Sequence, residues 1–298
     1  MVGQVRRTGR IRAVLAVALA VAVAAVLAAC SGASPGAGPP TYYLALGDSL
    51  SQGVQPDAAG ASTETAQGYP DLVYAQLRRD HPTLKLTQLG CPGETTKTMI
   101  QGGICRYPGG SQLAAAVAFL RAHRGHVLLV TIDIGANDPE ACGSQTSLGK
   151  LASCIGQVPS AAANLTTILA RLRAAAGQGV RIVGMNYYLP ELAEWRTGMM
   201  GRALAWAGER LAIAYNDQLD HAYAQANVGV ANVLGAFDTT NFGDPVTVPG
   251  IGSLPRNVAL ICEWTWECAP SPRGPNQHAN PAGYRVIAGV FLKAANLG

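Results

Sequence analysis

The sequence predicts a single-domain, three-layer α/β/α sandwich of the flavodoxin-like kind, with a parallel sheet of about five strands. Short apolar runs alternate five times with longer amphipathic runs, which is the order of strands and helices in parallel sheets. About 258 residues follow the N-terminal segments, enough for one sizeable α/β domain. We find no internal repeat and no pattern of a second domain.

The apolar runs have the composition of strands. His126–Ile134 (HVLLVTIDI) is nearly continuous, which is typical of a central parallel strand, whereas Leu84–Leu89 alternates between apolar and polar residues. The five predicted strands are Tyr42–Leu46, Leu84–Leu89, His126–Ile134, Arg181–Met185 and Val228–Leu234.

The amphipathic runs have the spacing of helices that pack on a sheet. Gly68–Asp80 repeats its apolar residues at helical spacing, and Asn280 followed by Pro281 is a capping residue with proline in the first turn. The five predicted helices are Gly68–Asp80, Gln112–His123, Ser160–Ala176, Gly201–Ala226 and Asn280–Asn296.

Residues 1–29 have the layout of an export signal. Four arginines precede the apolar run Ala13–Ala29, which ends in Leu-Ala-Ala-Cys and so resembles the lipobox of bacterial lipoproteins. We therefore predict cleavage before Cys30 and lipidation of that residue. An ordinary cleaved signal and an uncleaved anchor are the alternatives, although 17 residues is marginal for a membrane span.

Residues 30–40 form a Gly/Pro/Ser-rich tether, and the predicted domain spans residues 41–298. We expect an exported protein, either anchored to the outer face of the membrane through Cys30 or secreted. The signal contains four of the 22 lysine and arginine residues, so 18 basic residues face 18 acidic ones in the rest. This balance gives no reason to expect a nucleic-acid partner.

Six cysteines follow Cys30, and an even number in an exported chain indicates disulfides. Six cysteines allow 15 connectivities, of which we predict the sequence-local set. Each such loop closure is worth on the order of 3 kcal/mol by chain entropy. A zinc site is the alternative, but paired CxxC or HxxxH spacing is missing. The predicted pairs are Cys91–Cys105, Cys142–Cys154 and Cys262–Cys268.

Four groups of residues follow predicted strands or precede the last helix. Ser49 follows the first strand, Gly93 the second and Asn137 the third, while His278 lies just before the last helix. Because the carboxyl ends of parallel strands meet at one edge of a sheet, we expect these residues to lie together. A serine in such a turn is by itself more often a turn residue, so the prediction depends on this convergence.

His278 is the histidine that the predicted topology places near Ser49. The other four lie near the opposite edge of the sheet or inside a helix, and their one HxxH spacing lacks the glutamate of a metal motif. These four are His81, His123, His126 and His221.

Four motifs in order resemble blocks I, II, III and V of the SGNH (GDSL-type) hydrolase family: Gly47-Asp48-Ser49-Leu50, Gly93, Gly135-Ala136-Asn137-Asp138 and His278. The resemblance spans residues 42–295, and the cysteine pairs are further similar to those of secreted bacterial esterases of that family. It implies the SGNH hydrolase fold and a monomeric carboxylic ester hydrolase without metal or organic cofactor. The implied substrate is a small-molecule, lipid or glycan ester, and the lipid anchor is the expected membrane contact.

The resemblance also implies roles for the four residues. Ser49 attacks the ester carbonyl after His278 takes its proton, because a free hydroxyl is a poor nucleophile. The N–H groups of Ser49 and Gly93 and the side chain of Asn137 hold the negative oxygen that develops. Glycine lets the backbone approach closely, and an amide donates without adding charge.

One position departs from the family pattern. The family usually has an aspartate three residues before the histidine, where this sequence has Pro275, followed by Asn276. We expect a Ser49–His278 dyad. The second ring nitrogen of His278 is expected to donate either to a main-chain carbonyl, such as that of Pro275, or to an acidic residue from the preceding loops. An unassisted dyad is expected to be slower. The candidate acids are Glu263, Glu267 and Asp244.

A non-catalytic cell-envelope binding lipoprotein on the same scaffold is the alternative function that the missing aspartate leaves open. Thioesterase or phospholipase activity differs from the main hypothesis only in the substrate. Residues 186–195 (NYYLPELAEW), Trp264 and Trp266 are predicted pocket walls, or else part of the core.

Overall fold

The sheet is parallel throughout and has five strands in the order β4-β1-β5-β6-β7. The computed structural model describes residues 41–139 and 158–297. In the order of the chain the strands run 2-1-3-4-5, so the fold is the predicted flavodoxin-like one, with its topological switch point beside β1. The strands are β1 (Tyr42–Gly47), β4 (Lys85–Gln88), β5 (Val127–Asp133), β6 (Arg181–Met185) and β7 (Gly229–Ala231).

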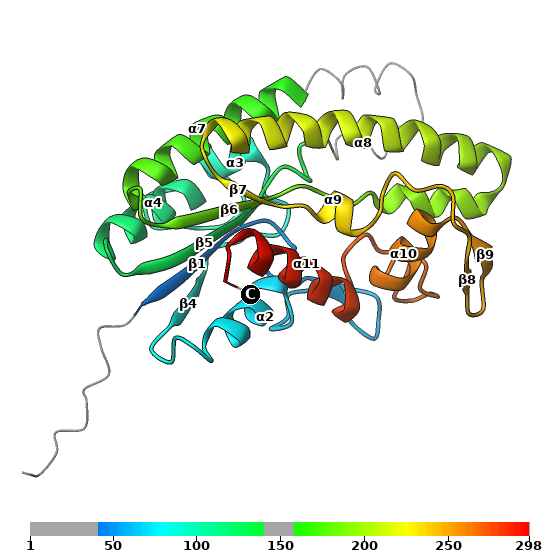
Figure 1. Cartoon of the computed structure of the whole chain (residues 1–298), viewed down its shortest axis with the longest axis horizontal. Coiled ribbons are helices and arrows are strands. Elements are labelled where there is room, and N and C mark those ends of the chain that lie inside the picture. The colour runs from blue at the N-terminus through cyan, green and yellow to red at the C-terminus, as the bar shows by residue number, and fades with distance from the viewer. Residues whose placement is uncertain (1–40, 140–157, 298) are drawn as a thin grey trace, which may run out of the picture. The chain divides into compact units, whose positions relative to one another are not determined.

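Helices cover both faces of the sheet, as predicted (Figure 1). One layer contains α3 (Thr96–Gln101), α4 (Gln112–Ala122), α7 (Val158–Ala176) and α8 (Met199–Gln225). The other layer contains α2 (Tyr69–Leu77) and α11 (Pro281–Ala294). Smaller elements lie between β6 and α11 or after β1: η1 (Pro190–Thr197), α9 (Val233–Ala236), α10 (Arg256–Trp264) and the hairpins β2–β3 (Gln55–Pro56, Ser62–Thr63) and β8–β9 (Val246–Val248, Gly252–Leu254).

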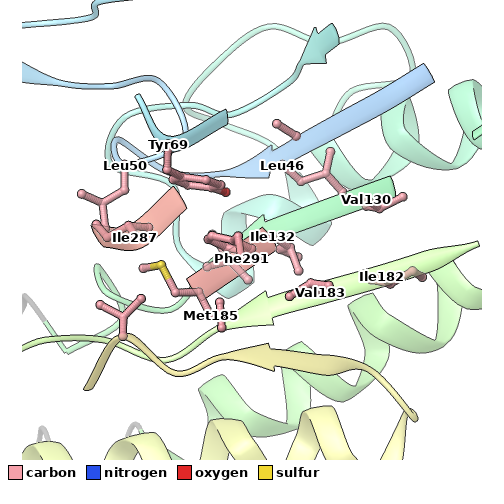
Figure 2. Packing of buried hydrophobic residues seen from close by; sticks show 14 of the residues in the cluster. Leu46, Leu50, Tyr69, Val130, Ile132, Ile182, Val183, Met185, Ile287 and Phe291 are labelled. Carbon is pink, nitrogen blue, oxygen red and sulfur yellow. The ribbon is translucent and has the colours of Figure 1, made fainter. Parts of the chain in front are cut away.

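The core lies between the sheet and these layers. β1 and β5 are buried along almost their whole length, as strands covered on both faces must be. Figure 2 shows the ring of Tyr69 from α2 and that of Phe291 from α11 against the side chains of the sheet, and the two rings stack with centroids 4.3 Å apart. This packing fixes β1 and β5, whose carboxyl ends carry Ser49 and Asn137.

The predicted strand Val228–Leu234 is too long. β7 ends at Ala231 because the side chain of Asn232 accepts the N–H of Gly235 and caps α9, which turns the chain out of the sheet. Neither α3 nor α10 was predicted from the sequence. α3 begins after Thr95, whose hydroxyl accepts the N–H of Thr98.

Two of the three predicted disulfides are present, Cys91–Cys105 and Cys262–Cys268. The third predicted pair, Cys142–Cys154, lies outside the described residues, as do the predicted signal, Cys30 and the tether, so these stay predictions. No helix in the described part of the chain combines the length and the apolar character that a membrane span needs.

Candidate active site

Ser49 lies half-buried in a compact turn that begins where β1 ends. Its carbonyl accepts the N–H groups of Gln52 at 3.2 Å and Val54 at 3.1 Å, which closes the turn. Gly47 has φ +134°, and a Cβ there would lie 2.2 Å from the carbonyl oxygen of Asp133, so only glycine fits. Within the described residues the main-chain N–H of Ser49 has no acceptor.

Asp133, the last residue of β5, fixes this turn through hydrogen bonds to its main chain. Its buried carboxyl group accepts the N–H of Ser51 at 3.1 Å and the hydroxyl of Tyr69 at 2.6 Å, and it also lies 3.4 Å from the N–H of Asp48. Burial, and then the adjacent carboxyl of Asp48, raise the pKa of Asp133 well above its usual value. We missed Asp133, although a lone acid in an apolar strand was a signal for a buried polar role.

Gly93 lies in the loop that follows β4, beside the turn of Ser49. The N–H of Cys91 donates to the carbonyl of Gly47 at 3.0 Å, which ties the two loops together. Gly93 has φ +81° and open space around its Cα, so glycine is required there by the backbone angle and not by crowding. It is exposed, and its N–H has no acceptor among the residues that the structure describes.

The side chain of Gln112 links the two loops a second time. This residue is fully buried at the start of α4 and bonds both main-chain polar groups of Gly47: its Oε1 accepts the N–H at 2.7 Å, and its Nε2 donates to the carbonyl at 2.9 Å. The same Nε2 donates to Oε2 of Glu94 at 3.2 Å. We missed Gln112, because its partners are distant in the sequence.

Asn137 follows β5 and meets the Gly93 loop. Its Nδ2 donates to the carbonyl of Glu94 at 2.8 Å. An amide nitrogen has two hydrogens, so one stays free for a ligand. The loop itself is fixed by the hydroxyl of Tyr215, which donates to the carbonyl of Gly135 at 2.6 Å. The structure therefore brings together the loops of Ser49, Gly93 and Asn137.

His278 is half-buried and oriented by Asn276. The Oδ1 atom of Asn276 lies 3.0 Å from the main-chain N–H of His278 and 2.8 Å from Nδ1 of its ring. A main-chain N–H can only donate, so the atom that it meets is the amide oxygen, and Nδ1 must carry a proton. This leaves Nε2 as the basic nitrogen. Burial lowers the pKa of His278 to about 4, so the ring is neutral at neutral pH.

This geometry corrects the predicted partner of the histidine. The ring bonds neither the carbonyl of Pro275 nor any candidate acid within the described residues. Asn276 takes the role because its short side chain folds back on the N–H two residues later, as in an Asx turn, and the same oxygen then faces Nδ1. The acids that are thereby excluded are Glu263, Glu267 and Asp244.

The segment of His278 packs on the residues that follow the Ser49 turn. The hydroxyl of Tyr284 donates to the carbonyl of Val54 at 2.9 Å, and Nδ2 of Asn276 donates to Oγ of Ser62 at 3.1 Å. In the described structure Ser49 and His278 share no direct hydrogen bond. Catalytic hydrogen bonds are often long without substrate and tighten in the complex.

Some of the predicted pocket-wall residues lie in the core, and others lie near the segment of His278. Tyr187 and Tyr188 are buried, and the hydroxyl of Tyr188 donates to the carbonyl of Gln277, beside the histidine, at 2.8 Å. Trp264 packs edge-on against Phe237 in the core, with centroids 5.1 Å apart. Trp266 is half-buried, and its indole N–H lies 3.4 Å from Oε1 of Gln55.

The other histidines lie where the sequence predicts. The carbonyl of His126 accepts the N–H of Tyr42 at the amino end of β1, and the ring of His123 packs on that of Tyr42, with centroids 4.0 Å apart. His81 precedes β4, and His221 is exposed on α8. The described residues contain no group of three or more His, Cys, Asp or Glu side chains arranged to hold a metal.

Comparison with known proteins identifies similar sequences and folds. The sequence pattern of the GDSL-like lipase/acylhydrolase family matches residues 45–286, and no curated protein matches the chain. The acetylxylan esterase Axe2 from Geobacillus stearothermophilus superposes with a TM-score of 0.54 at 16% identity, over 88% of this chain and 97% of that one. The extracellular lipase from Streptomyces rimosus gives a TM-score of 0.50 at 19% identity, over 85% and 99%.

Proposed function

The chain belongs to the GDSL-like lipase/acylhydrolase family and is a carboxylic ester hydrolase; on this premise we propose that it is an exported serine hydrolase that works through an acyl-enzyme on Ser49. The observation that carries the proposal is the linkage of the three loops that carry Ser49, Gly93 and Asn137. The N–H groups of Ser49 and Gly93 have no acceptor in the described chain, and the amide of Asn137 is tied to the same loop as Gly93.

The proposed reaction has two steps. Nε2 of His278 takes the proton of the Ser49 hydroxyl while Oγ bonds to the ester carbonyl carbon, and the tetrahedral intermediate then expels the alcohol, which leaves with that proton. In the second step His278 takes a proton from water, the hydroxide adds to the acyl carbon, and Ser49 is released with the proton as the acid departs. The protons balance, and no other reactant is needed.

The three donors stabilise the negative oxygen of both intermediates. The hydrogen bonds that link these loops support a preorganised site, in which little reorganisation is needed during the reaction. Removing one such donor typically costs about 10²–10³-fold in turnover.

Asn276 gives the histidine one of the two benefits that an aspartate would give. Its amide oxygen fixes the tautomer with the proton on Nδ1, but it adds no negative charge to stabilise the imidazolium. The low pKa of His278, which burial causes, agrees with this lack of a charged partner. We therefore expect turnover below that of an otherwise equal enzyme with a carboxylate.

We propose that the substrates are acyl or acetyl esters of lipid or glycan outside the cell. The two similar structures are named as an acetylxylan esterase and an extracellular lipase, so their names span both classes. The export signal in residues 1–29 and the lipobox-like Cys30 support export with a lipid anchor, and the two disulfides suit an oxidising compartment.

A non-catalytic binding protein is the second candidate, and the specific observation in its favour is Asn276 in place of a carboxylate. Hydrolysis of a short activated ester, 4-nitrophenyl acetate, separates the two. We expect the wild-type chain to turn it over and Ser49→Ala to lose the activity. Activity that survives Ser49→Ala contradicts the acyl-enzyme, and a folded wild type that is inert on acetyl and longer acyl esters supports the binding protein.

A further inference from the structure

The first half of α8 exposes an unusual set of apolar side chains. The exposed fractions are 89% for Met199, 73% for Met200, 55% for Leu204, 47% for Trp206 and 39% for Leu211. We call these five residues the α8 ridge. In the rest of the described chain one other large apolar side chain, Ile104 at 46%, is exposed to this degree. Soluble monomers rarely gather exposed apolar groups in this way unless the surface binds something.

The α8 ridge occupies the outer half of the helix in two rows, Met199 with Trp206 and Met200 with Leu204 and Leu211. Residues three, four or seven positions apart share a face, and the exposed Ala203 and Ala207 fill the gaps between the larger side chains. The opposite face is the one that packs on the fold: Gly201 is buried, and a Cβ there would lie 1.9 Å from the carbonyl of Glu194 in η1. This part of α8 therefore carries exposed apolar side chains that the packing of the fold does not use.

Aromatic rings support the α8 ridge from the side. Trp206 stacks on Phe242 with centroids 4.8 Å apart, and Phe242 in turn packs on Trp195 at 5.1 Å. The guanidinium of Arg202 lies 5.5 Å from the ring of Trp195. A tryptophan with a polar N–H on an apolar body suits the boundary between water and lipid.

The charges around the α8 ridge favour a lipid surface with negative headgroups. Both exposed charged side chains between residues 199 and 211 are arginines, Arg202 and Arg210, while Glu209 is buried. η1 adds Arg196 together with the exposed Glu191 and Glu194. Anionic phospholipid complements the two exposed arginines of the helix.

The position of the α8 ridge relates it to the candidate active site. α8 follows β6 through Tyr188 and η1, so the ridge starts on the carboxyl side of the sheet (Figure 1). The hydroxyl of Tyr188 bonds the carbonyl next to His278. The sequence independently predicts a lipid anchor at Cys30, which would keep the chain at a membrane.

We propose that the α8 ridge docks on the surface of an anionic phospholipid membrane and so presents the site to esters held there. The substrate part of this inference rests on the proposed function, whereas the docking part does not. Trp206, Met200 and Leu204 enter the interface between headgroups and acyl chains, and Arg202 and Arg210 contact lipid phosphates.

Quenching of tryptophan fluorescence by nitroxide-labelled lipid tests the docking. The full chain carrying Ser49→Ala is reconstituted into vesicles of phosphatidylcholine with about one third phosphatidylglycerol, and into vesicles of phosphatidylcholine alone. We expect quenching in the anionic vesicles that Trp206→Phe largely removes, and less of it in the neutral ones. The double variant Met200→Ser/Leu204→Ser should weaken the quenching about tenfold or more, while Ile104→Ser, the matched control outside the ridge, should not.

Unchanged quenching in Met200→Ser/Leu204→Ser, or no difference between Trp206→Phe and its parent, overturns the docking. A concentration-dependent dimer that the same double variant abolishes overturns it in favour of self-association. With Ser49 restored, the double variant should hydrolyse soluble 4-nitrophenyl acetate normally, which also reports its folding, but should lose about tenfold on an ester embedded in vesicles. A chain that hydrolyses the soluble ester but does not dock contradicts the docking surface and not the proposed function. A chain that docks but hydrolyses no ester contradicts the proposed function and not the docking surface.

Discussion

The two halves of the candidate site are held in different ways. The loops of Ser49, Gly93 and Asn137 are fixed by buried side chains that reach across the fold, Gln112 and Asp133 above all. The ring of His278 is oriented by a neighbour two residues away, while its segment is held by Tyr188 and by contacts with the exposed loop around Ser62. The first half therefore depends on buried side chains that are distant in the sequence, whereas the orientation of the His278 ring depends on a residue of the same segment.

This difference has a physical reason. Donors for a negative oxygen act through fixed distances, so they gain from attachment to a rigid sheet. A general base needs a defined tautomer, which a single amide oxygen can fix, whereas burial lowers its pKa. Substitutions in the first half should therefore act through geometry, and substitutions in the second half through proton chemistry.

The largest expected effect after that of Ser49 itself is on the base. His278→Ala removes the proton acceptor, and we expect kcat/KM to fall by about 10⁴-fold. Steady-state kinetics on 4-nitrophenyl acetate measures this. His221→Ala, an exposed histidine on α8, is the matched control and should keep full activity. A folded His278→Ala variant within tenfold of wild type contradicts the assigned role.

Gln112→Leu tests the geometric half without touching a reacting group. The change removes both bonds to Gly47 and the bond to Glu94, so the N–H groups of Ser49 and Gly93 lose their fixed separation. We expect kcat to fall by about 10²-fold with little change in KM. Gln101→Leu, at an exposed glutamine of α3, should be neutral. Thermal unfolding checks the fold, and an unchanged kcat in a folded variant shows that the link is dispensable.

Asn276→Asp tests the chemical half and should raise activity. A carboxylate keeps the bond to Nδ1 and adds a charge that favours the imidazolium, so the pKa of His278 rises from about 4 and turnover increases about tenfold. The base must be neutral to act, so the acid limb of the kcat/KM profile should move to higher pH. Asn276→Ala should instead lose activity. A slower Asn276→Asp enzyme with an unmoved acid limb contradicts the role of Asn276.

Asp133→Asn has the smallest expected effect, and this effect is on the pH dependence of the unfolding free energy. The folded pKa of Asp133 is raised, so the folded state keeps a proton that the unfolded chain loses above pH about 4. The stability of the wild type should therefore fall as the pH rises through that window and up to the folded pKa. The asparagine variant should lack this pH-dependent part of the stability. Chemical denaturation at several pH values would detect the difference as a shallower decrease of the unfolding free energy with pH. Equal slopes contradict the assignment.

The sequence allowed the sheet and the first half of the site to be predicted. Ser49, Gly93 and Asn137 were predicted to lie together because each follows a predicted strand, and the structure brings their loops together; their catalytic roles stay predictions. Gln112 could not be found, because its bond partner Gly47 lies 65 residues away and nothing in the local sequence links them.

The second half was harder to predict because it lacks strand signals. α10 and the β8–β9 hairpin lie between β7 and α11, where strands and helices do not alternate regularly. The end of β7 was misplaced because Asn232 was not recognised as the cap of α9. Asn276 was noted in the sequence, but its role depends on an Asx turn that only the backbone conformation reveals.

Labelling with a fluorophosphonate tests the central claim most directly, because such a reagent bonds only to a serine whose hydroxyl is activated by a base beside an oxyanion site. The account predicts stoichiometric labelling of the wild-type chain, located by peptide mass spectrometry on Ser49 and abolished by Ser49→Ala, with strongly slowed labelling in His278→Ala. A correctly folded wild-type chain that takes up no label, or a label located on another residue, would contradict the account.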